Sequence, residues 1–140
     1  LNMVLTTTGA GKASTIVLPE LAGKLTANAI RVPTPNVSLA IMNLELETAT
    51  TIETINNTIK QYSKGGDLME QIQYSSNPDF VSNDVIGTTA SAVFDAPSTL
   101  MSANGKRATI YVWYDNEYGY TCQVVRLAKY AAKVIRNRYY

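Results

Sequence analysis

Residues 90–120 read ASAVFDAPSTLMSANGKRATIYVWYDNEYGY, and this stretch carries the strongest indications of the fold. Three runs rich in β-branched and aromatic residues follow one another in it. Asn104-Gly105 separates the last two runs, and Asn-Gly between such runs is the strongest short-range signal of a β-hairpin. An amphipathic pattern begins directly after the third run. The stretch therefore predicts strands over 90–95, 99–102 and 106–114, followed by a helix.

The residues before this stretch alternate between predicted strands and predicted helices. Apolar residues at helical spacing predict a helix over 9–21, with Thr8 as its N-cap. Thr50 and Glu53 match the capping box of a second helix, which Gly65-Gly66 ends. Further strands are predicted over 3–6, 29–32, 37–47 and 69–75.

The last predicted helix runs from Glu117 to Arg138 and has an apolar stripe from Tyr120 to Ile135. Its basic residues, among them Arg136, suit the negative end of a helix dipole and form a solvated face. Strands in antiparallel succession with three helices predict an α+β domain of two layers. In this fold class the three helices pack on one face of a mostly antiparallel mixed sheet.

The composition excludes several classes of protein. A length of 140 residues indicates one domain, and 46% hydrophobic residues is too apolar for a disordered chain. The longest apolar runs fall far short of the roughly 20 residues that span a membrane. A net charge of +1 gives no support for binding to nucleic acid. With no histidine and one cysteine, Cys122, the chain lacks Cys–His and Ser–His pairs and a multi-thiolate zinc site.

The start at Leu1-Asn2 has no initiator methionine, and no signal peptide follows it. We interpret this start as an internal cut in a longer protein. Cys122 has no histidine to activate it, so we expect a buried structural thiol.

Two groups of residues near the N-terminus are candidates for binding an anion. The segment Thr8-Gly9-Ala10-Gly11-Lys12 has the wrong spacing for a nucleotide phosphate loop. It opens a predicted helix, however, and free N–H groups there either bind an anion or are merely capped by the threonine. Arg31 lies in a short apolar strand, where it either clamps an anion or forms an ion pair with a carboxylate.

A third candidate, residues 113–120, gathers aromatic rings, an amide and two carboxylates at a strand-to-helix junction. Such junctions at sheet ends often build sites. The alternative is structural: Asp115 or Asn116 caps the helix and the aromatic side chains belong to the core. The residues alone leave both interpretations open.

Long segments of the chain resemble signatures of the glyceraldehyde-3-phosphate dehydrogenase family. They are AIRVPTPNVS over 29–38, WYDNEYGY over 113–120, and the segment 1–13. They occur in family order, and the resemblance covers essentially the whole chain. It implies that residues 1–140 are part of the C-terminal catalytic domain.

The resemblance implies an enzyme in which a cysteine thiolate attacks an aldehyde, a histidine takes the proton, and NAD accepts the hydride. The dinucleotide-binding domain, the cysteine and the histidine precede this chain in the family pattern, so the chain alone is predicted to be inactive. The implied substrates are glyceraldehyde 3-phosphate and inorganic phosphate. The complete enzyme is implied to be a cytoplasmic homotetramer without nucleic-acid or membrane partners.

The resemblance also implies roles for five residues. Thr8 and Gly9 bind the attacking inorganic phosphate, and Arg31 holds the substrate's C3 phosphate. Asn116 hydrogen-bonds the nicotinamide carboxamide, and Tyr120 packs near the nicotinamide. No metal site is implied. Two alternatives remain: a fragment of an erythrose-4-phosphate dehydrogenase with the same motifs, and a non-catalytic interaction module derived from this domain.

Overall fold

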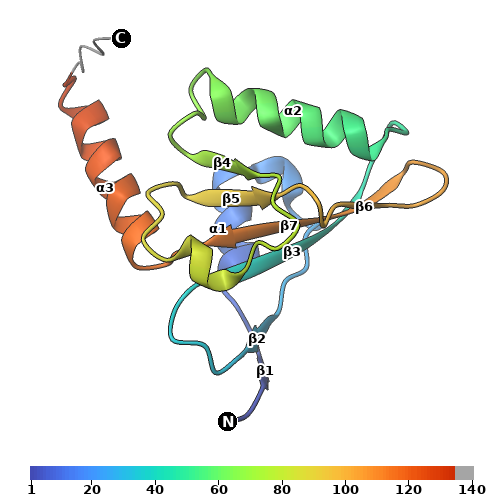
Figure 1. Cartoon of the computed structure of the whole chain (residues 1–140), viewed down its shortest axis with the longest axis horizontal. Coiled ribbons are helices and arrows are strands. Elements are labelled where there is room, and N and C mark those ends of the chain that lie inside the picture. Colours follow the sequence, from blue (N-terminus) through green and yellow to red (C-terminus); the bar gives the residue numbers. More distant parts are fainter. Residues whose placement is uncertain (135–140) are drawn as a thin grey trace. The chain divides into compact units, whose positions relative to one another are not determined.

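The computed structural model describes residues 1–134 (Figure 1). The chain divides into two compact units, Leu1–Pro35 and Asn36–Tyr140. The predicted helical residues Ile135 to Arg138, with the basic residues Arg136 and Arg138, lie outside the described residues.

The first unit is a two-stranded ladder with a helix in the connection. Strand β1 (Val4–Thr6) pairs antiparallel with β2 (Ala29–Arg31). Helix α1 (Ala10–Val17) and the short 3₁₀ helix η1 (Pro19–Leu21) lie between them. The single helix predicted over 9–21 is therefore interrupted at Leu18. Proline disfavours the helical conformation in the residue before it, and Leu18 accordingly has φ −122° and ψ 79°.

The second unit is built on a five-stranded mixed sheet. Four strands lie in the order β3 (Ser38–Glu45), β7 (Arg107–Tyr114), β5 (Ala92–Asp95) and β4 (Ile72–Ser75), and β6 (Leu100–Met101) pairs with β7. Three pairings are antiparallel, whereas β4 and β5 run parallel. The long connection between β4 and β5, which includes the 3₁₀ helix η2 (Ser82–Val85), permits this crossover. The parallel pair β4–β5 among antiparallel pairs confirms the predicted α+β class with a mostly antiparallel mixed sheet.

Helix α2 (Ile52–Lys64) begins one residue later than the sequence predicts. Thr51, not Thr50, is the N-cap, and its hydroxyl accepts a hydrogen bond from the Thr54 N–H at 3.1 Å. Thr50 is engaged elsewhere, because its N–H donates to the carbonyl of Gly105 at 2.9 Å. The predicted capping box is therefore wrong, although the predicted end at Gly65 is confirmed.

The predicted hairpin turn at Asn104-Gly105 is confirmed, and it packs against the residues before α2. Gly105 has φ +68°, a left-handed conformation that glycine adopts without strain. A Cβ atom on Gly105 would lie 2.6 Å from the carbonyl oxygen of Thr50. The turn thus needs glycine for two independent reasons.

The core of the second unit lies between α2 and the sheet. Phe94, Ala96 and Ile110 are buried at its centre. Ile55 and Ile59 of α2 pack on this cluster, as do Tyr74 and Val112 of neighbouring strands. Figure 1 shows α2 running along the sheet. The helical spacing therefore places Ile55 and Ile59 on the face that packs against the core, where they are half-buried.

Helix α3 (Tyr118–Ala131) follows β7 directly. Its first turn lies against the backbone before β5: a Cβ atom on the buried Gly119 would be 2.9 Å from the carbonyl oxygen of Ala90. The side chain of Gln123 also donates to the carbonyl of Thr89 at 2.9 Å. These contacts fix where α3 begins relative to the sheet. Within residues 1–134, no helix has the length and apolar character needed to cross a membrane.

Candidate functional site

Asp115 is the centre of the junction between β7 and α3. The residue is only 3% exposed. Its Oδ1 atom accepts hydrogen bonds from the backbone N–H groups of Glu117 and Tyr118, each at 2.9 Å. Its Oδ2 atom accepts a third, also at 2.9 Å, from the N–H of Gly87 in the loop after η2. The carboxylate therefore caps α3 and ties its start to a distant segment.

These N–H groups lower the pKa of Asp115 from its ordinary value of 3.8. The bond from Gly87 has the largest effect, followed by that from Tyr118, and the Asn36 side chain and the Glu117 N–H act in the same direction. Burial alone would raise the pKa, so the hydrogen bonds outweigh the cost of desolvation. Asp115 is consequently a fixed negative charge at neutral pH, placed where a helix N-terminus favours one.

Asn116 lies between Asp115 and the helix, and its side chain is exposed. Its Nδ2 atom donates to the Ser38 hydroxyl oxygen at 3.2 Å. Ser38 is the first residue of β3 and pairs with Tyr114 in the register. The sheet thus brings Ser38 and Asn116 to the same end of the β3–β7 ladder. The carboxamide of Asn116 retains an acceptor oxygen and a donor hydrogen for a ligand.

The residue before Ser38 is strained. Val37 has φ +75°, a conformation that is rare for a β-branched side chain. Its N–H donates to the side-chain oxygen of Asn36 at 2.7 Å, which helps to hold this geometry. Strain of this kind costs on the order of 1–3 kcal/mol and clusters at functional sites. It therefore marks residues 36–38 as part of the same candidate site.

Tyr120 lies in the first turn of α3 and is 69% exposed. Both residues implied to contact a nicotinamide, Asn116 and Tyr120, therefore lie at one junction with their side chains accessible. The structural alternative for residues 113–120 is true only in part: Glu117, not Asp115 or Asn116, is the N-cap of α3, but Asp115 accepts hydrogen bonds from the N–H groups of Glu117 and Tyr118. The same junction thus carries a structural carboxylate and an exposed amide.

In the first unit, Gly9 is the N-cap of α1 rather than Thr8. The half-buried Thr8 still contributes to the helix start, because its hydroxyl oxygen accepts from the N–H of Ala10 at 3.2 Å. Gly9 is exposed, so the backbone here is accessible to an anion.

Arg31 ends β2 and is exposed, contrary to the expected burial. The reason is that β2 has a single partner strand, β1, in a two-stranded sheet. No ion pair of Arg31 occurs among residues 1–134, so the alternative of a carboxylate partner is not found there. The register places Arg31 opposite Val4, whereas Thr8 follows the other end of β1. The two candidate anion-binding groups therefore lie at opposite ends of the ladder.

The comparison with known families decides the identity of the fold. The family model described as the C-terminal domain of glyceraldehyde 3-phosphate dehydrogenase matches residues 1–116. The chain belongs to the glyceraldehyde-3-phosphate dehydrogenase family. The matched residues contain Thr8, Gly9, Arg31 and Asn116, whereas Tyr120 lies just beyond them.

Relatives with this family name match over nearly the whole chain. A glyceraldehyde-3-phosphate dehydrogenase-like protein of Pseudomonas aeruginosa is 53% identical over 134 residues, which is 96% of this chain and 29% of the relative. Glyceraldehyde-3-phosphate dehydrogenases of Priestia megaterium and Geobacillus stearothermophilus are each 47% identical over 131 residues, 94% of this chain and 38% of each relative. The chain therefore spans about a third of the length of these relatives.

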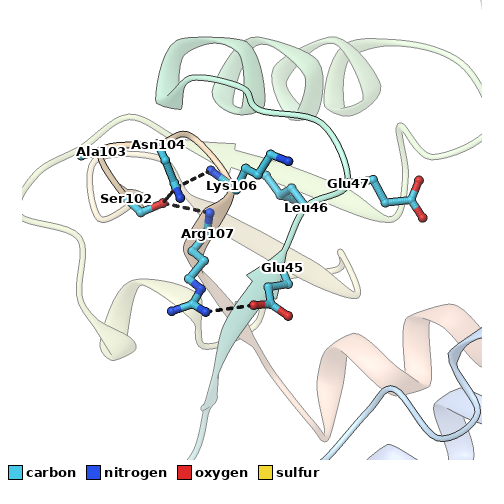
Figure 2. Close-up of a pocket in the computed structure, with 8 residues that line it drawn as sticks. All are labelled: Glu45, Leu46, Glu47, Ser102, Ala103, Asn104, Lys106 and Arg107. Carbon is cyan, nitrogen blue, oxygen red and sulfur yellow. Dashed lines mark hydrogen bonds and ion pairs between the residues drawn. The ribbon is translucent and has the colours of Figure 1, made fainter.

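A shallow depression at the hairpin turn lies apart from the candidate site residues (Figure 2). It lies where Glu45 pairs with Arg107, at the end of the β3–β7 ladder opposite to Ser38 and Tyr114. The Glu45–Arg107 ion pair measures 3.1 Å, and both side chains are largely exposed. Such pairs contribute about 0–1 kcal/mol. None of the predicted site residues lines this depression.

Cys122, in α3, is half-buried rather than buried as expected. Among residues 1–134 no cluster of histidine, cysteine and acidic side chains could hold a metal ion. Sequence reasoning missed Gly87 and Ser38, which hold Asp115 and Asn116. Neither carries a local signal, because both act through contacts with residues far away in the chain.

Proposed function

We propose that this chain is the C-terminal part of the catalytic domain of a phosphorylating, NAD-dependent glyceraldehyde-3-phosphate dehydrogenase. The observation that carries the proposal is the exposed amide of Asn116, held at the strand–helix junction of a chain from this family. An amide donates and accepts hydrogen bonds as the carboxamide of nicotinamide requires. Asn116 orients that carboxamide, and the exposed ring of Tyr120 packs near the nicotinamide.

The first unit supplies two phosphate contacts in this proposal. Thr8 and Gly9 bind inorganic phosphate through a hydroxyl group and backbone N–H groups at the start of α1. Arg31 binds the C3 phosphate of the substrate, since its guanidinium is exposed and matches phosphate oxygens in a bidentate way. The placement of these groups at opposite ends of the β1–β2 ladder supports two separate phosphates rather than one.

The reaction that the proposal assigns to the complete, homo-oligomeric enzyme is oxidation of the aldehyde to an acyl phosphate. NAD, when bound, supplies the hydride acceptor. The nucleophilic cysteine and the histidine base come from a segment that precedes this one in the family pattern. The described residues position the substrate phosphates and the nicotinamide, and the chain alone has no turnover.

The test uses a full-length hybrid in which residues 1–140 replace the matching segment of the Geobacillus stearothermophilus relative. We expect the hybrid to oxidise glyceraldehyde 3-phosphate with NAD, and the purified 140-residue chain to show no activity. Asn116→Ala should raise the KM for NAD about five- to tenfold, the effect of losing one hydrogen bond.

The matched control is Asn57→Ala, which removes an exposed asparagine on α2. It should leave the KM for NAD unchanged. Equal KM values for all three hybrids would remove Asn116 from the nicotinamide site. Turnover by the isolated chain, free of intact enzyme, would overturn the assignment of the catalytic groups to another segment.

A further inference from the structure

The position of the Asn116 side chain depends on its neighbour in the sequence. Asp115 holds the N–H groups of Glu117 and Tyr118 with one oxygen and the N–H of Gly87 with the other. The backbone of Asn116 is therefore fixed on both sides. The residue before it, Asp115, is buried and bonded to Gly87, and the two residues after it donate their N–H groups to the carboxylate of Asp115.

The second anchor of Asn116 is weaker. Its amide donates to a neutral hydroxyl oxygen, that of Ser38, at 3.2 Å, and Asn116 is exposed. Hydrogen bonds to an ionised acceptor are roughly twice as strong as those between neutral groups. Asp115 accepts three such bonds at 2.9 Å. The direction of the amide is consequently set through the Asp115 anchor more than through Ser38.

We infer that Asp115 is the positioning residue of the nicotinamide site, holding Asn116 in the orientation that selects one face of the cofactor ring. The inference rests on the proposed function of Asn116 and adds a residue to which no role in the site has been assigned so far. Asp115 itself is 3% exposed, so it acts through Asn116 rather than by touching a ligand.

Asp115→Asn tests this with little change of shape. One carboxylate oxygen becomes an NH₂ group, which cannot accept a hydrogen bond, so the bonds to Gly87 and to the start of α3 cannot both survive. Asp95→Asn is the matched control. Asp95 is also buried, 5% exposed, and accepts bonds from the indole N–H of Trp113 at 3.0 Å and the N–H of Ser98 at 3.3 Å. In the antiparallel register Phe94 lies opposite Val112, so the backbone of β5 at Asp95 runs away from the end of β7 that precedes Asp115.

The experiment compares these variants and Asn116→Ala in the full-length hybrid. It measures kcat, the KM for NAD, the thermal midpoint, and the face selectivity of hydride transfer with NADH deuterated on either face of C4. We expect Asp115→Asn to raise the KM for NAD at least fivefold and to transfer a measurable fraction of hydride from the wrong face. Asp95→Asn should lower the thermal midpoint without changing face selectivity. The double variant Asp115→Asn/Asn116→Ala should have the same KM for NAD and the same face selectivity as Asn116→Ala alone, because both changes act through one amide.

Each outcome separates the inference from the proposed function. If Asn116→Ala changes the NAD parameters and Asp115→Asn resembles Asp95→Asn, the positioning role is wrong and the proposed function stands. If Asn116→Ala has no effect, both are wrong. If Asp115→Asn fails to fold, amide hydrogen exchange in the unaltered hybrid decides: protected N–H groups at Gly87, Glu117 and Tyr118 support the anchor, and rapid exchange overturns it.

Discussion

At the scale of single residues, one buried carboxylate does most to define the candidate site. Asp115 satisfies three backbone N–H groups that would otherwise lack partners, and it remains charged because of them. Its lowered pKa has a consequence for stability. A carboxyl group whose folded pKa lies below its unfolded value stabilises the fold above the unfolded pKa, and that stabilisation is lost as pH falls through the folded pKa.

We therefore predict that the contribution of Asp115 to the free energy of unfolding is fully present at pH 7 and declines as pH falls below the ordinary pKa of 3.8. Urea unfolding followed by the fluorescence of Trp113, the single tryptophan, measures it in the second unit. The difference in unfolding free energy between the unaltered chain and Asp115→Asn should be constant from pH 6 to 7 and should shrink toward pH 3. The control, Asp79→Asn, removes the same single negative charge from an exposed carboxylate. A difference that grows in acid would contradict the prediction.

At the scale of elements, the close approach of α3 to the backbone before β5 depends on one buried glycine, Gly119. Alanine is the better helix former by about 1 kcal/mol, so propensity alone favours Gly119→Ala. The added methyl group would lie 2.9 Å from the Ala90 carbonyl oxygen, however, and backbone cannot move aside cheaply.

We predict that Gly119→Ala destabilises the second unit by about 1–3 kcal/mol, the usual cost of overpacking. Gly65→Ala is the control, since Gly65 has φ −163° and open space around it. It should change stability by less than about 1 kcal/mol. Chemical unfolding of both variants checks the prediction, and equal midpoints would show that α3 can shift away from Ala90.

Gly105 of the hairpin turn and Gly66, which follows α2, form a second pair of glycines that separates backbone strain from a clash. Gly66→Ala introduces a side chain at φ +78° into open space, and Gly105→Ala introduces one at φ +68° that also meets the Thr50 carbonyl oxygen at 2.6 Å. Both variants should lose about 1 kcal/mol from strain. Gly105→Ala should lose a further 1 kcal/mol or more from the contact. The thermal midpoints of the two variants, measured by calorimetry, give the comparison. A larger loss of stability for Gly66→Ala than for Gly105→Ala would contradict the predicted clash at Gly105.

Local patterns predicted those elements whose signals lie within a few residues. Asn104-Gly105 fixes its turn by chemistry of its own, and Gly65 ends α2 as expected. The N-cap of α2 was misplaced by one residue because Thr50 bonds to the distant Gly105. The parallel pairing of β4 with β5 and the Asp115–Gly87 bond likewise depend on the folded arrangement. A single sequence carries no local signal for such contacts.

The candidate site was predicted residue by residue from the family resemblance, not from physics. Periodicity and composition left Arg31 and Thr8 as either structural or functional. The roles of Thr8, Gly9, Arg31, Asn116 and Tyr120 stay predictions until the hybrid is measured. The structure adds that Asn116, Tyr120 and Arg31 are accessible, which each role requires.

At the scale of the whole molecule, the chain exposes apolar side chains on a sheet edge. Strand β3 is at the end of the sheet order, and it exposes Leu39, Ile41 and Leu44. An edge strand of this kind pairs readily with other chains. We predict that the isolated chain self-associates and binds dyes that report apolar surface. Light scattering from a monomer without dye binding would contradict this.

Ile41→Lys should weaken this association, because a charged side chain on an edge strand opposes pairing. Ile41 is 56% exposed, so the substitution leaves the core unchanged. Val81→Lys is the control, in a loop and 53% exposed. Sedimentation velocity of the three chains at one concentration makes the comparison, and equal sizes for Ile41→Lys and the unaltered chain would exclude the β3 edge as the contact.

The late position of β7 in the chain affects how the protein is made. β7 pairs with β3, β5 and β6, so none of these three pairings forms before β7 is synthesised, and the pairing with β3 extends to Tyr114. While it grows on the ribosome, the chain carries β3 without its partner over more than sixty residues, as the pairing of Glu45 with Arg107 spans 62. Such non-local pairing is slow and leaves apolar strands open to wrong contacts. Translation speed and chaperone supply across residues 46–114 should therefore affect the yield of folded protein.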